Sequence, residues 1–172
     1  SEMCIRDSAK VLQARLKRFQ VRKTQFQKLR RAVGAARSAL VLRTGGTEAL
    51  TYGQANTGVS SSMLYSQRRA VAAAASPGGA GDLELIMLLT DGSSHGRADP
   101  AFEAHCSPMV MWAEAVWSRW LPSADLDRLV IYAKKNLEGR SRPWSVVRGP
   151  AAAFVASVLS RHFLSHPTSF SG

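Results

Sequence analysis

The segment from residue 8 to residue 33 contains no glycine or proline, and its apolar residues recur in steps of three, four and seven positions. This spacing gathers the apolar side chains on one face of an α-helix and leaves the other face polar. The first residue to interrupt the pattern is Gly34. The segment therefore predicts one long amphipathic helix, whose core-facing residues are Leu12, Leu16, Phe19, Phe26, Leu29 and Val33.

The rest of the chain consists of shorter periodic segments separated by turn residues. The pattern predicts helices at 35–43, 60–75, 100–120, 124–137 and 151–163. Residues 82–89 fit either a short helix or a buried strand, because a run of apolar residues does not distinguish the two. No segment shows a convincing strand alternation. The predicted fold class is mostly α: a multi-helix bundle with a long basic N-terminal helix.

Several residues are expected to begin, break or end these helices. Gly45-Gly46 should end the second helix, and Tyr52-Gly53 should interrupt the next helix, which is expected to begin after Thr47. Pro100 suits the first turn of a helix, whereas Pro108 should kink or split that helix. Short polar side chains that accept hydrogen bonds from free backbone N–H groups are expected as N-caps at Thr47, Ser60, Asp99 and Ser123.

The positive charge of the chain is concentrated in residues 8–47. The formal net charge of the chain is +11. Residues 8–47 alone have a net charge of +11, because they contain eleven lysines and arginines and no aspartate or glutamate. Solvated helix faces normally mix both signs, so the segregation favours a polyanionic partner, nucleic acid first and an anionic membrane surface second. The bases are Lys10, Arg15, Lys17, Arg18, Arg22, Lys23, Lys28, Arg30, Arg31, Arg37 and Arg43.

Length and composition exclude several classes of protein. A chain of 172 residues with 45% hydrophobic residues can bury a core without disulfides or metal. Two cysteines exclude a disulfide scaffold and a four-thiolate zinc site. No apolar run reaches the roughly 18 residues of a membrane span, and no secretory signal leads the sequence. We expect an intracellular protein, nuclear or cytoplasmic, that is not secreted.

The two ends of the sequence are expected to lie outside the fold. Residues 1–7, Ser-Glu-Met-Cys-Ile-Arg-Asp, resemble the translated end of a sequencing adapter of the kind found on metagenomic fragments. Residues 164–172 have the composition of a disordered tail. Between them, residues 8–47 form the basic helical segment, and residues 48–163 form a second helical region.

Catalytic and metal-binding patterns are weak. The candidate metal ligands lack the paired spacing of a structural zinc site, and Cys106 has no evident base partner and is expected to be a buried thiol. Asp91 follows an apolar run as in the first strand of a ribonuclease H, but too little chain follows it for that fold. We expect no metal and no cofactor; the candidate ligands considered are His95, His105, Cys106, His162 and His166.

Four tryptophans offer another possible binding chemistry, because exposed indole rings can stack on bases. Trp112, Val116 and Trp120 are spaced to share one helix face, which favours packing in the core. Trp117 and Trp144 are further candidates for stacking on bases. For the tryptophans as a group, packing in the core is preferred to base stacking.

A series of short motifs runs along about residues 10–160 in the order Lys28-Leu29-Arg30-Arg31, Tyr52-Gly53, Gly58-Val59-Ser60, Gln67-Arg68-Arg69, Asp99-Pro100-Ala101-Phe102, Pro143-Trp144 and Arg148-Gly149-Pro150-Ala151-Ala152-Ala153-Phe154. No single motif is specific. Their order resembles the region that follows the reverse-transcriptase palm in LINE-type (non-LTR) retrotransposon polyproteins.

The resemblance implies a thumb-like or connector region that grips the backbone of a template–primer duplex, RNA or RNA–DNA, next to its own palm and downstream domains. It implies no catalysis by this chain, since the paired aspartates of the family's polymerase are missing from the sequence. By similarity to the family's basic helix, the nucleic-acid-binding residues would be Arg15, Arg18, Arg22, Lys23, Arg30 and Arg31.

Two other functions fit the same residues. The chain could be a helical protein-interaction or connector domain that docks an acidic partner. Alternatively, the first helix could lie on an anionic membrane surface, with Phe19 and Phe26 inserted among the lipids. The membrane alternative ranks third, because the later segments supply enough apolar surface to cover that stripe.

Overall fold

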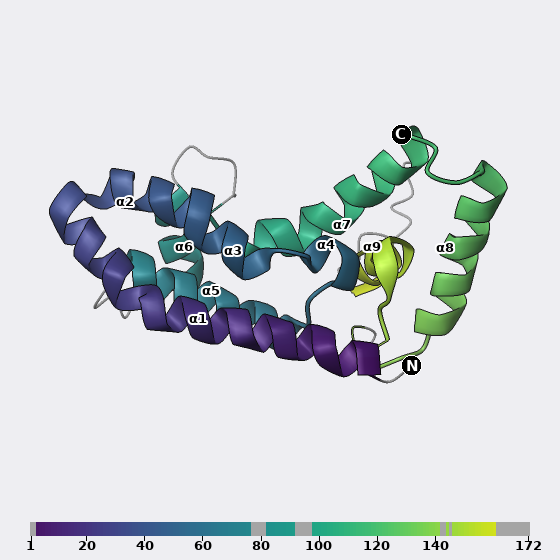
Figure 1. The fold of residues 1–172 in the computed structure, drawn as a ribbon, viewed down its shortest axis with the longest axis horizontal. Helices are drawn as coiled ribbons and strands as arrows, with labels where there is room; N and C mark the ends of the chain where they lie inside the picture. Colours follow the sequence, from purple (N-terminus) through teal and green to yellow (C-terminus); the bar gives the residue numbers. More distant parts are fainter. Residues whose placement is uncertain (1–2, 77–81, 92–97, 142–143, 145, 161–172) are drawn as a thin grey trace, which may run out of the picture.

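The computed structural model describes residues 3–76, 82–91, 98–141, 144 and 146–160. All regular secondary structure in these ranges is helical, so the predicted mostly-α class with a long N-terminal helix is confirmed (Figure 1). The elements are α1 (Met3–Val33), α2 (Ala35–Val41), the π-helix η1 (Leu42–Thr47), α3 (Glu48–Thr51), α4 (Gln54–Thr57), α5 (Ser61–Ala75), α6 (Leu83–Asp91), α7 (Pro100–Trp117), α8 (Ser123–Leu137) and α9 (Gly149–Ser160).

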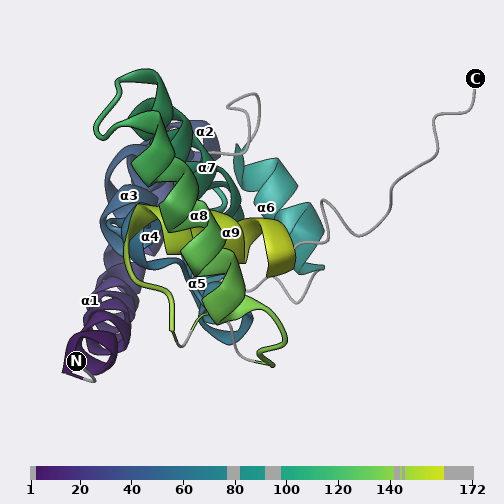
Figure 2. The same ribbon diagram turned by 90° about the vertical axis from the view of Figure 1, so that its right-hand side faces the viewer.

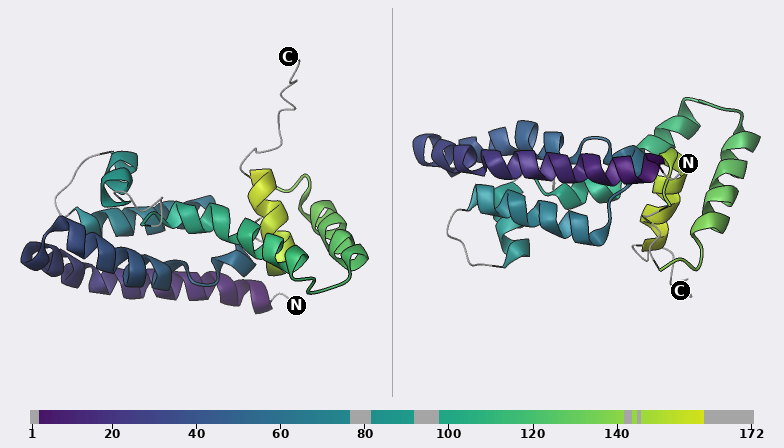
Figure 3. Two further views of the ribbon diagram at one scale, coloured as in Figure 1. Left: turned by 90° about the horizontal axis from the view of Figure 1, so that it is seen from above. Right: turned by 60° about the horizontal axis from the view of Figure 1, so that its bottom comes forward.

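The molecule is elongated, and α1 runs along most of its length (Figures 1 and 3). The chain reverses at Gly34, whose φ of 85° is left-handed, and α2, η1 and α3 return beside α1. Helix α5 packs along another side of α1. At the far end, α8 and α9 pack against each other, with α9 also contacting α7 (Figure 2).

The largest core cluster lies between α1 and the helices that return beside it. It joins Phe19 of α1 to residues of η1, α3, α5 and α6, and Leu16 and Phe26 pack against its edge. The rings of Phe19 and Phe26 stack with centroids 5.5 Å apart. The apolar face of α1 is therefore covered by the chain's own helices as far as Leu29, which is half-buried. The prediction that Val33 faces the core is wrong, because its side chain is 37% exposed at the end of α1, next to the chain reversal at Gly34. The cluster contains Phe19, Leu42, Leu50, Ala70, Val71, Ala72, Ala74 and Met87.

Separate clusters hold the other end of the molecule together. Leu12 of α1 packs with residues of α5 and α7, while Leu137 of α8 packs with residues of α9. Trp112 of α7 stacks on Phe154 of α9 with ring centroids 5.9 Å apart. These contacts fix α7, α8 and α9 beside the bundle that α1 supports.

Helix α1 begins at Met3, five residues before the predicted start. Residues 3–7 contain neither glycine nor proline, so no residue there opposes extension of the helix. The resemblance of these residues to a translated adapter therefore does not prevent them from adopting the conformation of the helix that follows.

The prediction that Gly45-Gly46 ends a helix is wrong, because the helical backbone continues through both residues as η1 into α3. A Cβ at Gly46 would lie 2.9 Å from Leu42 Cδ1 and 3.0 Å from Phe26 Cζ. Gly46 therefore allows η1 to approach α1 closely. The capping role predicted for Thr47 is also wrong: its buried hydroxyl donates to the Ala98 carbonyl at 3.2 Å.

Other local predictions are confirmed. Ser60 Oγ accepts from the Met63 N–H at 3.3 Å, and Asp99 Oδ1 accepts from the Ala101 N–H at 2.9 Å, so both residues cap helices. The chain breaks at Tyr52-Gly53, where Gly53 has a left-handed φ of 83°. The segment that fitted either helix or strand is helical and forms α6.

Two expectations about proline and serine differ from the structure. Of the two effects predicted for Pro108, splitting is wrong, because α7 runs unbroken from Pro100 to Trp117; Ala104 and Pro108 are both buried, and packing holds the helix on either side of the missing backbone hydrogen bond. Ser123 is the first residue of α8 rather than its cap, and Pro122 occupies the N-cap position without a side-chain bond. The last helix begins at Gly149, two residues earlier than predicted.

Candidate polyanion-binding surface

Three arginines of α1 line one side of a groove between α1 and the returning helices. Arg15, Arg18 and Arg22 are separated by three and four residues, so they lie along one flank of α1. The opposite wall comes from the end of α2, η1 and α3, including the backbone of Gly45 and Gly46. The groove has a volume of about 390 Å³ and an apolar floor that includes Phe19 and Phe26. We call it the arginine groove.

Arg15 is held by the protein itself. Its Nη1 donates to the carbonyl of Tyr52, the C-cap residue of α3, and its guanidinium carbon lies 5.1 Å from the centroid of the Tyr52 ring. A cation beside the free carbonyls at a helix C-terminus is stabilised by the helix dipole. Arg15 therefore helps fix the Tyr52-Gly53 break against α1.

Arg30 has a similar structural role at the other end of the bundle. Its Nη1 donates to the carbonyl of Ala75, the last residue of α5, and Gln27 Nε2 donates to the Ala73 carbonyl at 2.9 Å. Both acceptors lie in the final turn of α5, where backbone carbonyls lack helical partners. Arg30 and Gln27 thus attach α1 to the C-terminal end of α5.

The other four predicted binding residues differ in exposure. Arg18, Arg22 and Arg31 are exposed, whereas Lys23 is half-buried between the positions of Phe19 and Phe26. Within the described residues, no carboxylate forms an ion pair with any base between Lys10 and Arg31. These cations are neither dispersed over the fold nor neutralised by later acids of the described chain.

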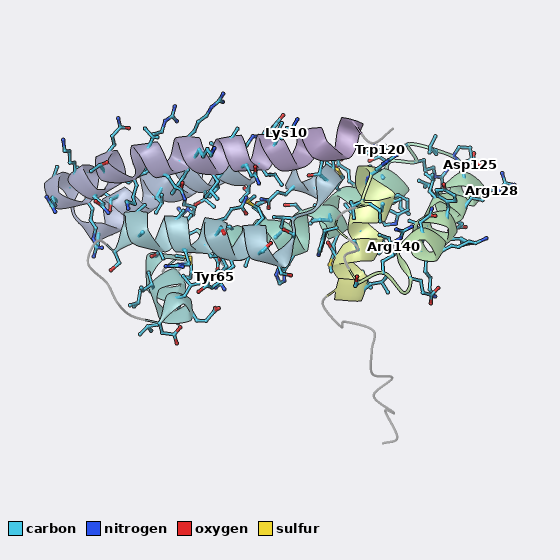
Figure 4. All side chains as sticks on the ribbon, turned by 90° about the horizontal axis from the view of Figure 1, so that it is seen from below. Lys10, Tyr65, Trp120, Asp125, Arg128 and Arg140 are labelled. Atoms are coloured by element: carbon cyan, nitrogen blue, oxygen red, sulfur yellow. The ribbon has the colours of Figure 1, made fainter. Side chains whose placement is uncertain are left out.

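A second group of bases lies on the outer side of α1. Lys10, Lys17 and Lys28 are exposed and differ by seven and eleven residues, which is close to two and three helical turns. Side chains with nitrogen tips project from this side of α1, away from the other helices, where Lys10 is labelled (Figure 4). We call these three residues the lysine face. Sequence reasoning noted these lysines but did not include them among the binding residues.

Acidic side chains near the bundle are engaged by a different arginine. Arg68 of α5 binds Asp99 at 2.7 Å and Glu84 at 2.6 Å. The hydrogen bond to Glu84 is the main cause that raises the pKa of Arg68 above its ordinary value, and the same bond lowers the pKa of Glu84. This network joins α5, α6 and the start of α7. Its carboxylates therefore face Arg68 and are not paired with α1.

The tryptophans divide between core and surface. Trp112 is 9% exposed and belongs to the core, as predicted. Core packing is wrong for Trp120 and Val116, which are exposed, and Trp117 is 90% exposed. Helix α7 ends at Trp117 and the chain turns at Arg119, whose φ is 49°, so helical spacing no longer relates Trp120 to Trp112. Trp144 is half-buried against Gly58.

The candidate metal and catalytic residues do not come together. In the described ranges, no group of three or more His, Cys, Asp or Glu side chains is arranged to hold a metal. Cys106 is half-buried rather than fully buried, and Asp91 ends a helix rather than a strand. The tail at 164–172 and three of the candidate histidines lie outside the described residues; the histidines are His95, His162 and His166.

The packing of α1 also bears on the membrane alternative. Phe19 is buried and Phe26 packs on the same core, so the aromatic side chains proposed for lipid insertion face the protein. In the described part of the chain, no helix combines the length and the apolar character that crossing a bilayer requires.

No protein-family model matches the chain, and neither the curated proteins nor the solved structures searched contain a match to it. Function is therefore argued from the residues and their geometry.

Proposed function

We propose that this chain binds the phosphate backbone of nucleic acid through α1. The observation that carries the proposal is the set of exposed, unpaired cations on this helix, in a segment without acids. Arginine and lysine neutralise phosphates and release condensed counterions, which gives affinity without a choice of sequence. Arg18 and Arg22 are the proposed phosphate contacts on the arginine-groove flank. Arg31 follows Arg22 by nine residues, which places it on the opposite side of α1, where it joins the lysine face as a second row of contacts.

Arg15 and Arg30 have a different place in this proposal. Each donates to a carbonyl at a helix C-terminus, so each stabilises the surface rather than presenting a free charge. Lys23, half-buried, contributes less than the exposed bases. Of the six residues expected from the sequence, three thus remain in the proposed interface, Arg18, Arg22 and Arg31, and the three lysines of the lysine face are added.

The resemblance to the region after the palm of LINE-type reverse transcriptases gives the proposal a biological setting. Several of its motif residues lie at joints of the fold: Tyr52 accepts from Arg15, Gly58 lies against Trp144, and Asp99 both caps α7 and binds Arg68. In this setting the chain is a non-catalytic thumb-like or connector region. A genomic reading frame that encodes a palm with paired aspartates upstream of residue 8 would support this origin, and a frame without one would contradict it.

The binding proposal is tested by fluorescence anisotropy with duplex DNA, duplex RNA and an RNA–DNA hybrid at several salt concentrations. The double variant Arg18→Gln/Arg22→Gln should weaken binding by more than about tenfold near 0.1 M salt and reduce the salt slope by about 2. Lys134→Gln/Lys135→Gln on α8 removes the same charge from another exposed surface and is the matched control. Equal loss in both variants would show that only net charge matters and would reject the interface.

A further inference from the structure

A second groove lies at the end of the bundle where the chain reverses. Its walls are α2, the last residues of α5 and one side of α6, and it has a volume of about 450 Å³. Phe26 and Leu42 lie at its base, and Leu40 and Leu89 lie at its sides. We call it the α2–α6 groove. It uses different walls from the arginine groove, although Phe26 lines both.

Helix α6 carries apolar side chains on two sides. Met87 is buried in the core, whereas Leu88 is 67% exposed and Leu89 is 73% exposed. Leu85, also exposed, precedes these residues by three and four positions, so the three leucines share the outer face of α6, and of them only Leu89 lines the groove, next to Ile86. Exposed Leu40 of α2 stands on the other wall. Contiguous exposed apolar side chains of this kind mark an interaction surface.

The charged residues of the groove define the partner's charge. Arg30 and Arg43 line it, and no Asp or Glu is among its described lining residues. Arg30 already donates to Ala75, while Arg43 has no hydrogen bond or ion pair within the described part of the chain. An apolar groove with a cationic border complements a helix that has leucines on one face and acids beside them.

We propose that the α2–α6 groove binds an acidic amphipathic helix of a partner protein. The chain's own last segment, residues 161–172, contains no acid and so does not supply this complement. A helix partner fits because Ile86 and Leu89, three residues apart on α6, line the groove together with Leu40 of α2 and can interlock with a ridge of apolar side chains on another helix. The proposal is independent of nucleic-acid binding by α1, since Arg18 and Arg22 do not line this groove.

The probe is a fluorescent helical peptide of about 18 residues, five turns long, with leucines on one face and glutamates elsewhere. Its control is the same peptide with lysine in place of every glutamate. We expect the glutamate peptide to bind with micromolar affinity and the lysine peptide to bind at least about tenfold more weakly. Equal affinity for both peptides, or no binding of either, would overturn the proposal.

Variants of the chain locate the binding site. Leu40→Gln/Leu89→Gln should weaken binding of the glutamate peptide by at least about tenfold, and Arg43→Gln should weaken it by about threefold to fivefold. Leu129→Gln/Ile131→Gln changes exposed apolar residues of α8 and is the matched control. Circular dichroism of all variants should be unchanged because the altered side chains are exposed or half-exposed. Equal weakening by the α8 control would place the peptide elsewhere and reject the groove.

Sedimentation velocity tests a second copy of the chain as the occupant. We expect a monomer across the concentrations used for peptide binding. A dimer that is lost in Leu40→Gln/Leu89→Gln would assign the groove to self-association and would overturn the proposal of an acidic partner.

Discussion

The guanidinium of Arg15 lies over the ring of Tyr52, 5.1 Å from its centroid, and donates to the carbonyl of the same residue. One residue of the long helix thus binds both the side chain and the backbone of the residue at which the third α-helix ends. Arg18, only three positions away on the same flank, has no such partner within the described residues.

This difference predicts opposite phenotypes for two identical substitutions. Arg15→Gln should lower the free energy of unfolding by about 1–2 kcal/mol, because it removes a charge-assisted hydrogen bond and a cation–π contact. Arg18→Gln should change stability by less than about 0.5 kcal/mol and should mainly weaken nucleic-acid binding. Urea unfolding and anisotropy titrations on both variants provide the measurement. Equal destabilisation by the two substitutions would contradict the assigned roles.

The glycine pair of η1 provides a matched test of packing. Gly46→Ala should destabilise the protein by about 1–3 kcal/mol, since the new Cβ would press on Leu42, Phe26 and Phe19. Gly45→Ala meets no atom within 4 Å and should be neutral or stabilising by up to about 1 kcal/mol, because alanine favours helical backbone. Thermal unfolding followed by circular dichroism compares them. If Gly46→Ala is as stable as Gly45→Ala, the close approach of η1 to α1 does not depend on the missing side chain at residue 46.

Two tryptophans on the same helix should respond differently to truncation. Trp112→Ala should cost about 3–5 kcal/mol, because it removes a buried ring stacked on Phe154. Trp117→Ala should cost less than about 0.5 kcal/mol, since its ring is in solvent. Chemical denaturation measures both values. A large loss on truncating Trp117 would mean that its ring packs in solution.

The pKa of Glu84 predicts a pH dependence. Its hydrogen bond with Arg68 lowers that pKa in the folded state, so the stabilisation is present above the ordinary glutamate pKa of about 4.3 and is lost as the pH falls through the folded-state value. Glu84→Gln should therefore lower the urea midpoint at pH 7, and its difference from the unaltered protein should shrink at pH 3. The effect should be small, because Glu84 is mostly exposed.

Glu138→Gln is the control for this pH series, since Glu138 is exposed and forms no ion pair within the described residues. Its urea midpoint should follow that of the unaltered protein at both pH values. A difference for Glu84→Gln that persists undiminished at pH 3 would show that the carboxylate's charge is not the source of the stabilisation.

The parts of the fold that depend on neighbours in sequence could be predicted. The span of α1, the caps at Ser60 and Asp99 and the break at Tyr52-Gly53 each follow from a few adjacent residues. The role of Gly46 could not be predicted in this way. The rings of Phe19 and Phe26, which leave no room for a side chain at this position, belong to α1, about twenty residues earlier in the sequence.

The candidate site shows the same division. Charge segregation identified α1 as the cationic element. Sequence alone could not show that Arg15 and Arg30 bind backbone carbonyls while Arg18 and Arg22 present free charges. The carbonyls that accept from Arg15 and Arg30 belong to residues 37 and 45 positions away, so only the folded arrangement distinguishes the bound guanidiniums from the free ones. Trp120 was misassigned for a related reason, since a turn at Arg119 ends the periodicity on which the prediction depended.

Phe26 forms part of the wall of both grooves. An occupant that shifts this ring in one groove changes the shape of the other, which makes the two grooves candidates for thermodynamic linkage. Linkage is reciprocal: if nucleic acid changes the affinity for the helical peptide by some factor, the peptide must change the affinity for nucleic acid by the same factor. Titrating each ligand with the other at saturation measures that factor, and a value of one would mean that the ring transmits nothing.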